Sequence, residues 1–137
     1  MPVPQLTDDQ MCFGCGSRNP RGLKLSFEVD KKSTALRCTW TPGKEYQGYA
    51  DIVHGGVLGV VLDEVMGNLL YLNGRPAVTA EMTVRFHKPA HVGKPLRFEA
   101  HLGSIDGRRI QMEADAKTES GVLVASAQAK FVSMEKK

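Results

Sequence analysis

The segment IVHGGVLGVVLDE, residues Ile52–Glu64, opens the pattern that decides the fold of this chain. From Gly55 to Asn73 apolar residues recur at intervals of three and four, which is the period of an amphipathic helix. The pair Asn73-Gly74 is typical of a helix end, and the predicted helix is about 28 Å long. Its apolar positions are Leu58, Val61, Leu62, Val65, Leu69 and Leu72.

The rest of the chain alternates apolar and polar residues with the period of two that is typical of β-strands. Asp106-Gly107 and Ser120-Gly121 are turn sequences that join the last three predicted strands as hairpins. Strands before and after a single long helix indicate an α+β domain, in which an antiparallel sheet of about six strands wraps around the central helix. The first strand is expected around Leu23, Leu25 and Phe27, and the others are Thr34–Trp40, Ala77–Lys88, Leu96–Ile105, Arg109–Thr118 and Val122–Met134.

Composition and charge exclude several classes of protein. The 137 residues are 42% apolar and 24% charged, which fits one globular domain over residues 1–137. The net charge of +3 comes from scattered Lys and Arg, so we expect no nucleic-acid partner. The first ten residues lack a secretory signal pattern, and Asp63 and Glu64 in the apolar helix oppose membrane insertion. We therefore expect a cytoplasmic protein that does not bind a membrane.

Cys12 and Cys15 in the motif CFGCG have the Cys-x-x-Cys spacing of many zinc sites. A closed tetrahedral site needs four ligands, and the sequence offers no second close pair. The total of three cysteines is odd, which argues against a disulfide framework in a reducing compartment. We therefore expect free thiols, a structural role for this motif, and no bound metal or other cofactor.

Asp63 lies on a stripe of small residues along the predicted helix. Gly55, Gly59, Asp63, Gly67 and Tyr71 are spaced by four and therefore follow one side of the helix. A glycine inside a helix costs about 1 kcal/mol relative to alanine, which suggests that something approaches the backbone closely here. Two interpretations fit: a partner helix packed across a homodimer, or a substrate that lies along the stripe.

The start of the helix favours the substrate interpretation. The backbone N–H groups of Gly55 and Gly56 have no acceptor within the helix, and the helix dipole adds partial positive charge there. These amides are suited to polarise a carbonyl oxygen, while Asp63 acts on the same substrate as a base. This combination indicates acyl transfer. As an isolated histidine, His54 fits a structural cap better than a catalytic group.

The polar residues near Asp63 in the sequence are weaker candidates for a catalytic role. Glu64 is turned by about 100° from Asp63 around the helix axis, so we expect it at a polar rim or an interface. In the strand that follows, alternate residues form a polar row that is typical of a solvent-facing or interfacial side. This row contains Thr79, Glu81, Thr83, Arg85 and His87, opposite Ala80, Met82, Val84 and Phe86.

Three stretches together resemble a known family. YQGYADIVHGGVLGVVLDEVMG, followed by GRPAVTAEMTVRFHKPAHVGKPL, is similar to hotdog-fold acyl-CoA thioesterases of the phenylacetate-degradation and 4-hydroxybenzoyl-CoA thioesterase type. CFGCGSRNPRGLKLSF also resembles the leader of many such domains. The resemblance implies a hotdog fold, assembly as a homodimer or homotetramer, and an active site at the dimer interface.

The resemblance also implies roles for particular residues. The catalytic carboxylate of the family corresponds to Asp63, acting as general base on water or as nucleophile. The amide that polarises the carbonyl corresponds to Gly55, with Gly56 beside it, and the histidine that shapes this turn corresponds to His54. A hydroxyl that places the attacking water corresponds to Thr79, expected from the partner subunit.

One substrate-binding position of the family does not align strictly. Some members carry an amide side chain before the His-Gly-Gly motif, and Gly48 occupies the matching place here, with Gln47 one residue away. Gln47 is therefore the candidate for substrate binding. Arg85, His87, Lys88 and Arg97 are candidates for contact with the phosphates of coenzyme A and receive no assignment from the sequence.

The sequence thus predicts an acyl-CoA thioesterase that needs no metal or cofactor. The alternative is a hotdog module that binds acyl-CoA, or an acyl group on a carrier protein, without turnover. Asp63 separates the two, because a binding module gains nothing from a carboxylate beside a bound carbonyl. A hotdog dehydratase fits less well, because such enzymes pair a histidine and an acid in a different local context.

Overall fold

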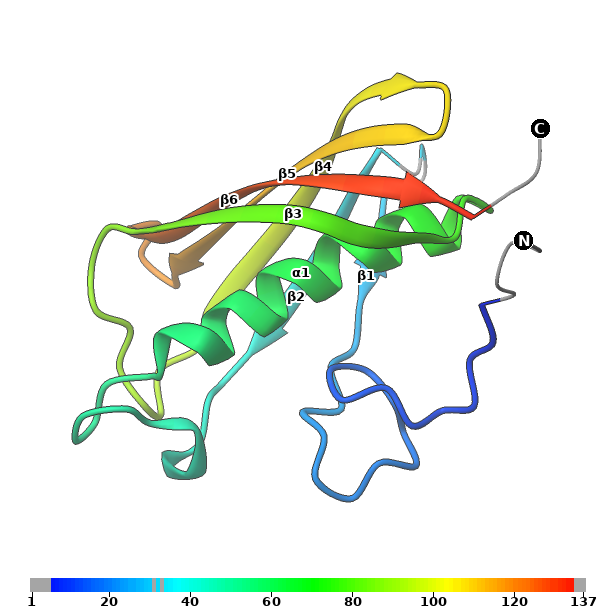
Figure 1. Ribbon diagram of the computed structural model, residues 1–137. Coiled ribbons are helices and arrows are strands. Elements are labelled where there is room, and N and C mark those ends of the chain that lie inside the picture. Colours follow the sequence, from blue (N-terminus) through cyan, green and yellow to red (C-terminus); the bar gives the residue numbers. More distant parts are fainter. Residues whose placement is uncertain (1–5, 31, 33, 135–137) are drawn as a thin grey trace.

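The computed structural model describes residues 6–30, 32 and 34–134, and it contains one long helix and a curved sheet. The sheet is antiparallel throughout, with the strand order β1-β2-β4-β5-β6-β3. Figure 1 shows this sheet arching over α1, with the N-terminal loop below the helix. This is the predicted hotdog architecture. The elements are β1 (Glu28–Val29), β2 (Ala35–Trp40), the 3-10 helix η1 (Lys44–Tyr46), α1 (Gly55–Leu72), β3 (Ala77–Phe86), β4 (Leu96–Asp106), β5 (Arg109–Thr118) and β6 (Leu123–Ser133).

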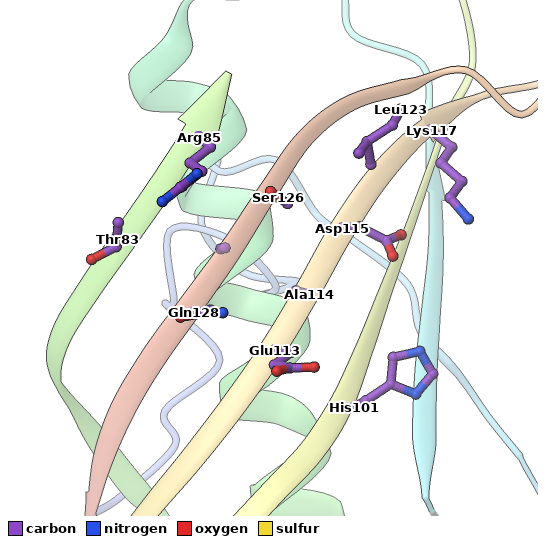
Figure 2. Close-up of a pocket in the computed structure, with 11 residues that line it drawn as sticks. Thr83, Arg85, His101, Glu113, Ala114, Asp115, Lys117, Leu123, Ser126 and Gln128 are labelled. Carbon is purple, nitrogen blue, oxygen red and sulfur yellow. The ribbon is translucent and has the colours of Figure 1, made fainter. Parts of the chain in front are cut away.

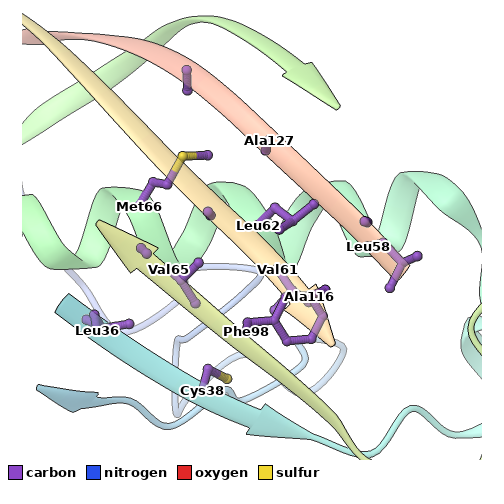
Figure 3. Close-up of a cluster of buried hydrophobic side chains, with 14 of the residues drawn as sticks. Leu36, Cys38, Leu58, Val61, Leu62, Val65, Met66, Phe98, Ala116 and Ala127 are labelled. Carbon is purple, nitrogen blue, oxygen red and sulfur yellow. The ribbon is translucent and has the colours of Figure 1, made fainter. Parts of the chain in front are cut away.

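The hydrophobic core lies between α1 and the inner face of the sheet (Figure 3). Large apolar side chains of α1 and of the strands are fully buried there, among them Leu62, Met66 and Phe98. Five of the buried positions on β5 and β6 are alanines, whose small side chains let the helix approach the sheet. By length and composition alone α1 resembles a membrane-spanning helix, a property that it shares with the core helices of globular domains.

The first strand is shorter than the sequence pattern predicts. Leu23 and Leu25 are buried, but β1 contains only Glu28 and Val29. The reason is that the backbone N–H groups of Leu23 and Leu25 donate to the carbonyl oxygens of Phe13 and Gly14. This segment therefore pairs with the CFGCG loop instead of extending the sheet.

The second difference is a β-bulge in β3 that reverses the direction of one side chain. The register with β6 shifts between Thr79 and Glu81, so that Thr79 lies opposite Phe131 and Glu81 lies opposite Lys130. Phe131 is buried and Lys130 is exposed, and opposed residues share a face of the sheet. The prediction that Thr79 belongs to the outward polar row is therefore wrong, because the bulge turns Thr79 toward α1.

Candidate active site

Asp63 and Thr79 meet between α1 and the edge strand β3. The Thr79 hydroxyl donates a hydrogen bond to Asp63 Oδ1 at 2.5 Å. Both residues line a cavity of about 570 Å³, together with Tyr71, Val78 and Phe131. The resemblance led us to expect Thr79 from a partner subunit, but here the Thr79 of the same chain holds the carboxylate. The bulge next to Thr79 makes this contact possible.

His54 caps the start of α1. Its Nδ1 accepts a hydrogen bond from the Gly56 N–H at 2.9 Å, and its carbonyl oxygen accepts from Val57 and Leu58. This is the structural role that its isolated position favoured. The Gly56 amide is thus already engaged, whereas the Gly55 N–H has no acceptor in the described part of the chain. Gly55, rather than Gly56, is the amide available to a ligand.

Gly55 lies close to the far end of β3. A Cβ atom on Gly55 would come within 3.3 Å of Phe86 Cζ, which is tight for such a contact. Gly55 and Phe86 line a separate cavity of about 280 Å³, and His87 and Lys88 contribute to the same wall. The ends of β3 thus lie against different parts of α1: Phe86 against Gly55, and Thr79 against Asp63.

The two ends of the predicted site do not converge within one chain. Asp63 follows Gly55 by eight residues, a separation of about 12 Å along a helix, and the two residues line different cavities. A thioester carbonyl bound at the Gly55 amide therefore lies beyond the reach of the Asp63 carboxylate in the same chain.

Gln47 stabilises the loop before the helix. Its side-chain oxygen accepts a hydrogen bond from the Asp51 N–H at 3.0 Å, and Asp51 has a positive φ of 63°. The backbone of Gln47 also forms a bridge with Val53. Gln47 does not line the cavity of Gly55 or that of Asp63, so its predicted contact with substrate stays a prediction.

Glu64 contacts the CFGCG loop instead of an exposed rim. Its Oε1 accepts a hydrogen bond from the Cys12 thiol at 3.1 Å, and its Oε2 accepts from Asn68 Nδ2 at 2.9 Å. Burial raises the pKa of the Cys15 thiol far above its usual range, and the Cys12 hydrogen bond and the Glu64 charge add to that shift. The sequence pattern missed this contact, because nothing local links a cysteine pair to a glutamate about fifty residues away.

Cys38 is a separate, buried thiol in the core. Its side chain lies on β2 among the apolar residues that face α1 (Figure 3). Burial, with a smaller contribution from the charge of Glu64, raises the pKa of Cys38 to about 11. A neutral thiol at this position is inert at physiological pH.

A polar groove of about 480 Å³ crosses the face of the sheet that points away from α1 (Figure 2). Side chains from β3 to β6 line it, including Arg85, His101, Asp115 and Lys117. Burial raises the pKa of Asp115, and the charge of Lys117 offsets part of that increase. The sheet separates this groove from α1 and therefore from Asp63.

Comparison with known proteins identifies the class to which this fold and site belong. The family model of the Thioesterase superfamily matches residues 50–125. This range covers α1, β3, β4 and β5, including Gly55, Asp63 and Thr79. The chain therefore belongs to the thioesterase superfamily.

Individual relatives agree with this assignment. The Xenopus laevis acyl-coenzyme A thioesterase THEM4 is 24% identical over 115 residues, which cover 82% of this chain and 51% of THEM4. The chain thus spans about half the length of this curated relative. The crystal structure of RHA08564, a thioesterase superfamily protein, is 29% identical with a TM-score of 0.84, over 95% of this chain and 68% of that one.

Two further solved structures share the fold. The Escherichia coli PaaI protein from the phenylacetic acid degradation operon has a TM-score of 0.75 at 18% identity, over 80% of this chain and 83% of PaaI. A hypothetical thioesterase from Streptococcus pneumoniae, solved with coenzyme A, has a TM-score of 0.73 at 18% identity, over 79% and 85%. The family model confirms the predicted resemblance to thioesterases, and PaaI shares the fold.

Proposed function

We propose that this chain is an acyl-CoA thioesterase in which Asp63 carries the reaction. The observation that supports this most is the contact between the Thr79 hydroxyl and the Asp63 carboxylate in a cavity at the edge of the sheet. Membership of the thioesterase superfamily and the relation to THEM4, which is named an acyl-coenzyme A thioesterase, support the same substrate class.

The proposed reaction is hydrolysis of a thioester. Water adds to the carbonyl carbon, the bond from that carbon to sulfur breaks, and the products are a carboxylic acid and the free thiol of coenzyme A. In one route Asp63 removes a proton from the attacking water, and that proton ends on the leaving sulfur. In the other route Asp63 attacks the carbonyl carbon, the thiolate leaves, and water then hydrolyses the resulting mixed anhydride and supplies the proton for the thiol. Thr79 fixes the orientation of the carboxylate through its hydroxyl, and so limits the geometries that Asp63 adopts.

The Gly55 amide is the proposed donor to the carbonyl oxygen. It lies at the N-terminus of an 18-residue helix, where the unpaired N–H groups and the helix dipole stabilise negative charge. His54 occupies the neighbouring Gly56 amide and fixes the direction of this turn. Lys88 lines the same cavity as Gly55 and is the proposed contact for a coenzyme A phosphate.

A second copy of the chain is needed to join the two ends of this site. β3 is the last strand in the sheet order, and no other strand in the described residues pairs with its outer edge. Val78 and Phe86 of this strand are 38% and 56% exposed. A ten-residue open edge with exposed apolar side chains is a surface that another strand covers readily.

Antiparallel pairing of two β3 strands would bring the required groups together. In such a pair, the Phe86 end of one strand lies beside the Thr79 end of the other. Because Phe86 lies against Gly55 and Thr79 against Asp63, the partner's helix start then approaches Asp63. We therefore propose a homodimer with two shared sites, and a homotetramer is compatible with the same pairing.

The isosteric variant Asp63→Asn distinguishes a thioesterase from a module that binds acyl-CoA without hydrolysing it. We expect wild-type protein to release free thiol from acyl-CoA esters, and Asp63→Asn to lower kcat by at least about 1,000-fold. The binding of a non-hydrolysable acyl-CoA thioether should stay within a few-fold of wild type. Equal thiol release by both proteins would refute the role of Asp63, and no release by wild type over a broad acyl-CoA panel would favour the binding module.

A further inference from the structure

The CFGCG loop and α1 place two thiols and one carboxylate around a single point. The Sγ atoms of Cys12 and Cys15 and a carboxylate oxygen of Glu64 lie within 4.8 Å of one another. We propose that these three residues bind a zinc ion, which fastens the N-terminal loop to α1. These three residues and Asp63 line one cavity, but the zinc proposal does not depend on the proposed hydrolysis.

Glu64 supplies the ligand that the sequence alone does not reveal. A lone Cys-x-x-Cys pair falls short of a zinc site, but a carboxylate within reach raises the number of protein ligands to three. Glu64 already accepts a hydrogen bond from the Cys12 thiol at 3.1 Å. Replacing that thiol proton by a metal ion needs only small shifts of the same atoms. The fourth position is left for a water molecule from the adjoining cavity.

The loop is shaped around the Glu64 side chain. A Cβ atom on Gly14 would collide with the carboxylate of Glu64, and one on Gly16 would collide with the backbone of Cys12. The loop therefore needs glycine at position 16 to close, and a side chain at position 14 would displace the Glu64 carboxylate from its present place. Backbone hydrogen bonds from Leu23 and Leu25 hold the opposite side of the loop, so both thiols are held in place before a metal binds.

Asn68 orients the Glu64 carboxylate without being a ligand of the proposed zinc ion. One turn after Glu64, its Nδ2 donates to Glu64 Oε2 and to the Glu64 carbonyl oxygen, both at 2.9 Å. These bonds occupy one carboxylate oxygen and turn the other toward the thiols. The same amide lies 4.0 Å from Cys15 Sγ, where an N–H group supports a thiolate. Fixing metal ligands through outer hydrogen bonds is typical of metal sites in proteins.

The ligand set selects zinc over the other common divalent ions. Thiolates are soft ligands that Mg²⁺ and Ca²⁺ avoid, whereas Zn²⁺ binds two cysteines and a carboxylate readily. Binding converts both thiols to thiolates and releases two protons, so the affinity should rise with pH. The metal would be bound by Glu64, the residue after Asp63. It would stabilise the loop that forms one wall of the Asp63 cavity.

Metal content and affinity test this site directly. We expect the full chain, purified with reductant, to bind one zinc ion in a competition titration against a chromophoric chelator. Cys12→Ala and Cys15→Ala should each weaken zinc binding by at least 100-fold, and Glu64→Gln by at least 10-fold. Cys38→Ala removes a thiol outside the cluster and should bind zinc like wild type. With Co²⁺, the thiolate charge-transfer absorption should vanish in the two cluster variants alone.

Thermal unfolding distinguishes a variant that has lost a zinc ligand from a variant that no longer folds. A strong chelator should lower the Tm of wild type and of Cys38→Ala, and Zn²⁺ but not Mg²⁺ should restore it. The Cys12→Ala and Cys15→Ala proteins should show neither response. Equal zinc affinity in wild type and both cluster variants would overturn the proposal. A disulfide between Cys12 and Cys15 in protein alkylated directly in the cell lysate would overturn it too.

Discussion

Two adjacent carboxylates on α1 face regions of opposite character. Asp63 points toward β3, where the Thr79 hydroxyl holds it in a cavity. Glu64 points toward the CFGCG loop, where Cys12 and Asn68 engage its two oxygens. Both carboxylates line one cavity, yet the same chemical group has a proposed catalytic role at Asp63 and attaches a loop at Glu64. The turn of about 100° per residue separates the two roles.

The largest expected effect, a loss of turnover, comes from replacing a carboxylate with an amide of the same shape at Asp63. The same replacement at Glu64 serves as the comparison. Asp63→Asn should abolish most turnover and lower the free energy of unfolding by no more than about 1 kcal/mol, because Asp63 accepts a hydrogen bond from one side chain whereas Glu64 accepts from two. Glu64→Gln should lower that free energy by about 1–3 kcal/mol, because it weakens contacts to a charged acceptor, and lower turnover by less than about tenfold. Thiol release and urea unfolding measure the two quantities. Equal loss of turnover in both variants would contradict the assignment of catalysis to Asp63 and of loop attachment to Glu64.

The next effect concerns Thr79. Thr79→Val keeps the shape of the side chain and removes the donor to Asp63, so kcat should fall by about 10–100-fold with little change in KM. Thr79→Ser keeps the hydroxyl and should retain most of the activity. If valine and serine gave equal rates, the hydroxyl would have no part in orienting the carboxylate.

The smallest effect concerns two glycines of the helix stripe. Cβ atoms on Gly59 and Gly67 would lie 3.9 Å from Met82 Cε and 3.6 Å from Phe131 Cε2, which are ordinary contacts. Alanine at either position should therefore stabilise the fold by up to about 1 kcal/mol. Gly67 lines the Asp63 cavity, so Gly67→Ala should also lower kcat/KM a few-fold, whereas Gly59→Ala should not. Unchanged kinetics for Gly67→Ala would argue that substrate does not reach this stripe.

The sequence predicts the parts of the molecule that depend on local patterns. The helix from Gly55, its end at Asn73, and the hairpins at Gly107 and Gly121 follow from residue spacing and turn chemistry, and the structure confirms them. Each of these features is determined by contacts between residues close in the chain.

Features that depend on distant contacts were predicted less well. The bulge that turns Thr79 inward depends on pairing with β6, and a strict alternation along β3 placed Thr79 on the wrong face. The meeting of Glu64 with Cys12 and the pairing of Leu23 with Phe13 likewise join segments that no local pattern connects. The resemblance to a family located the candidate residues, and the folded chain determined which of them meet.

The central claim is that Asp63 of one chain acts with the Gly55 amide of another. Gly55→Pro deletes that amide at the first position of the helix, where proline is well tolerated, and Gly55→Ala controls for the contact with Phe86. Neither Asp63→Asn nor Gly55→Pro homodimers should turn over. A heterodimer of the two, isolated with two different affinity tags, contains one intact shared site and should recover about half of the wild-type activity. A heterodimer as inactive as its parents would contradict the account.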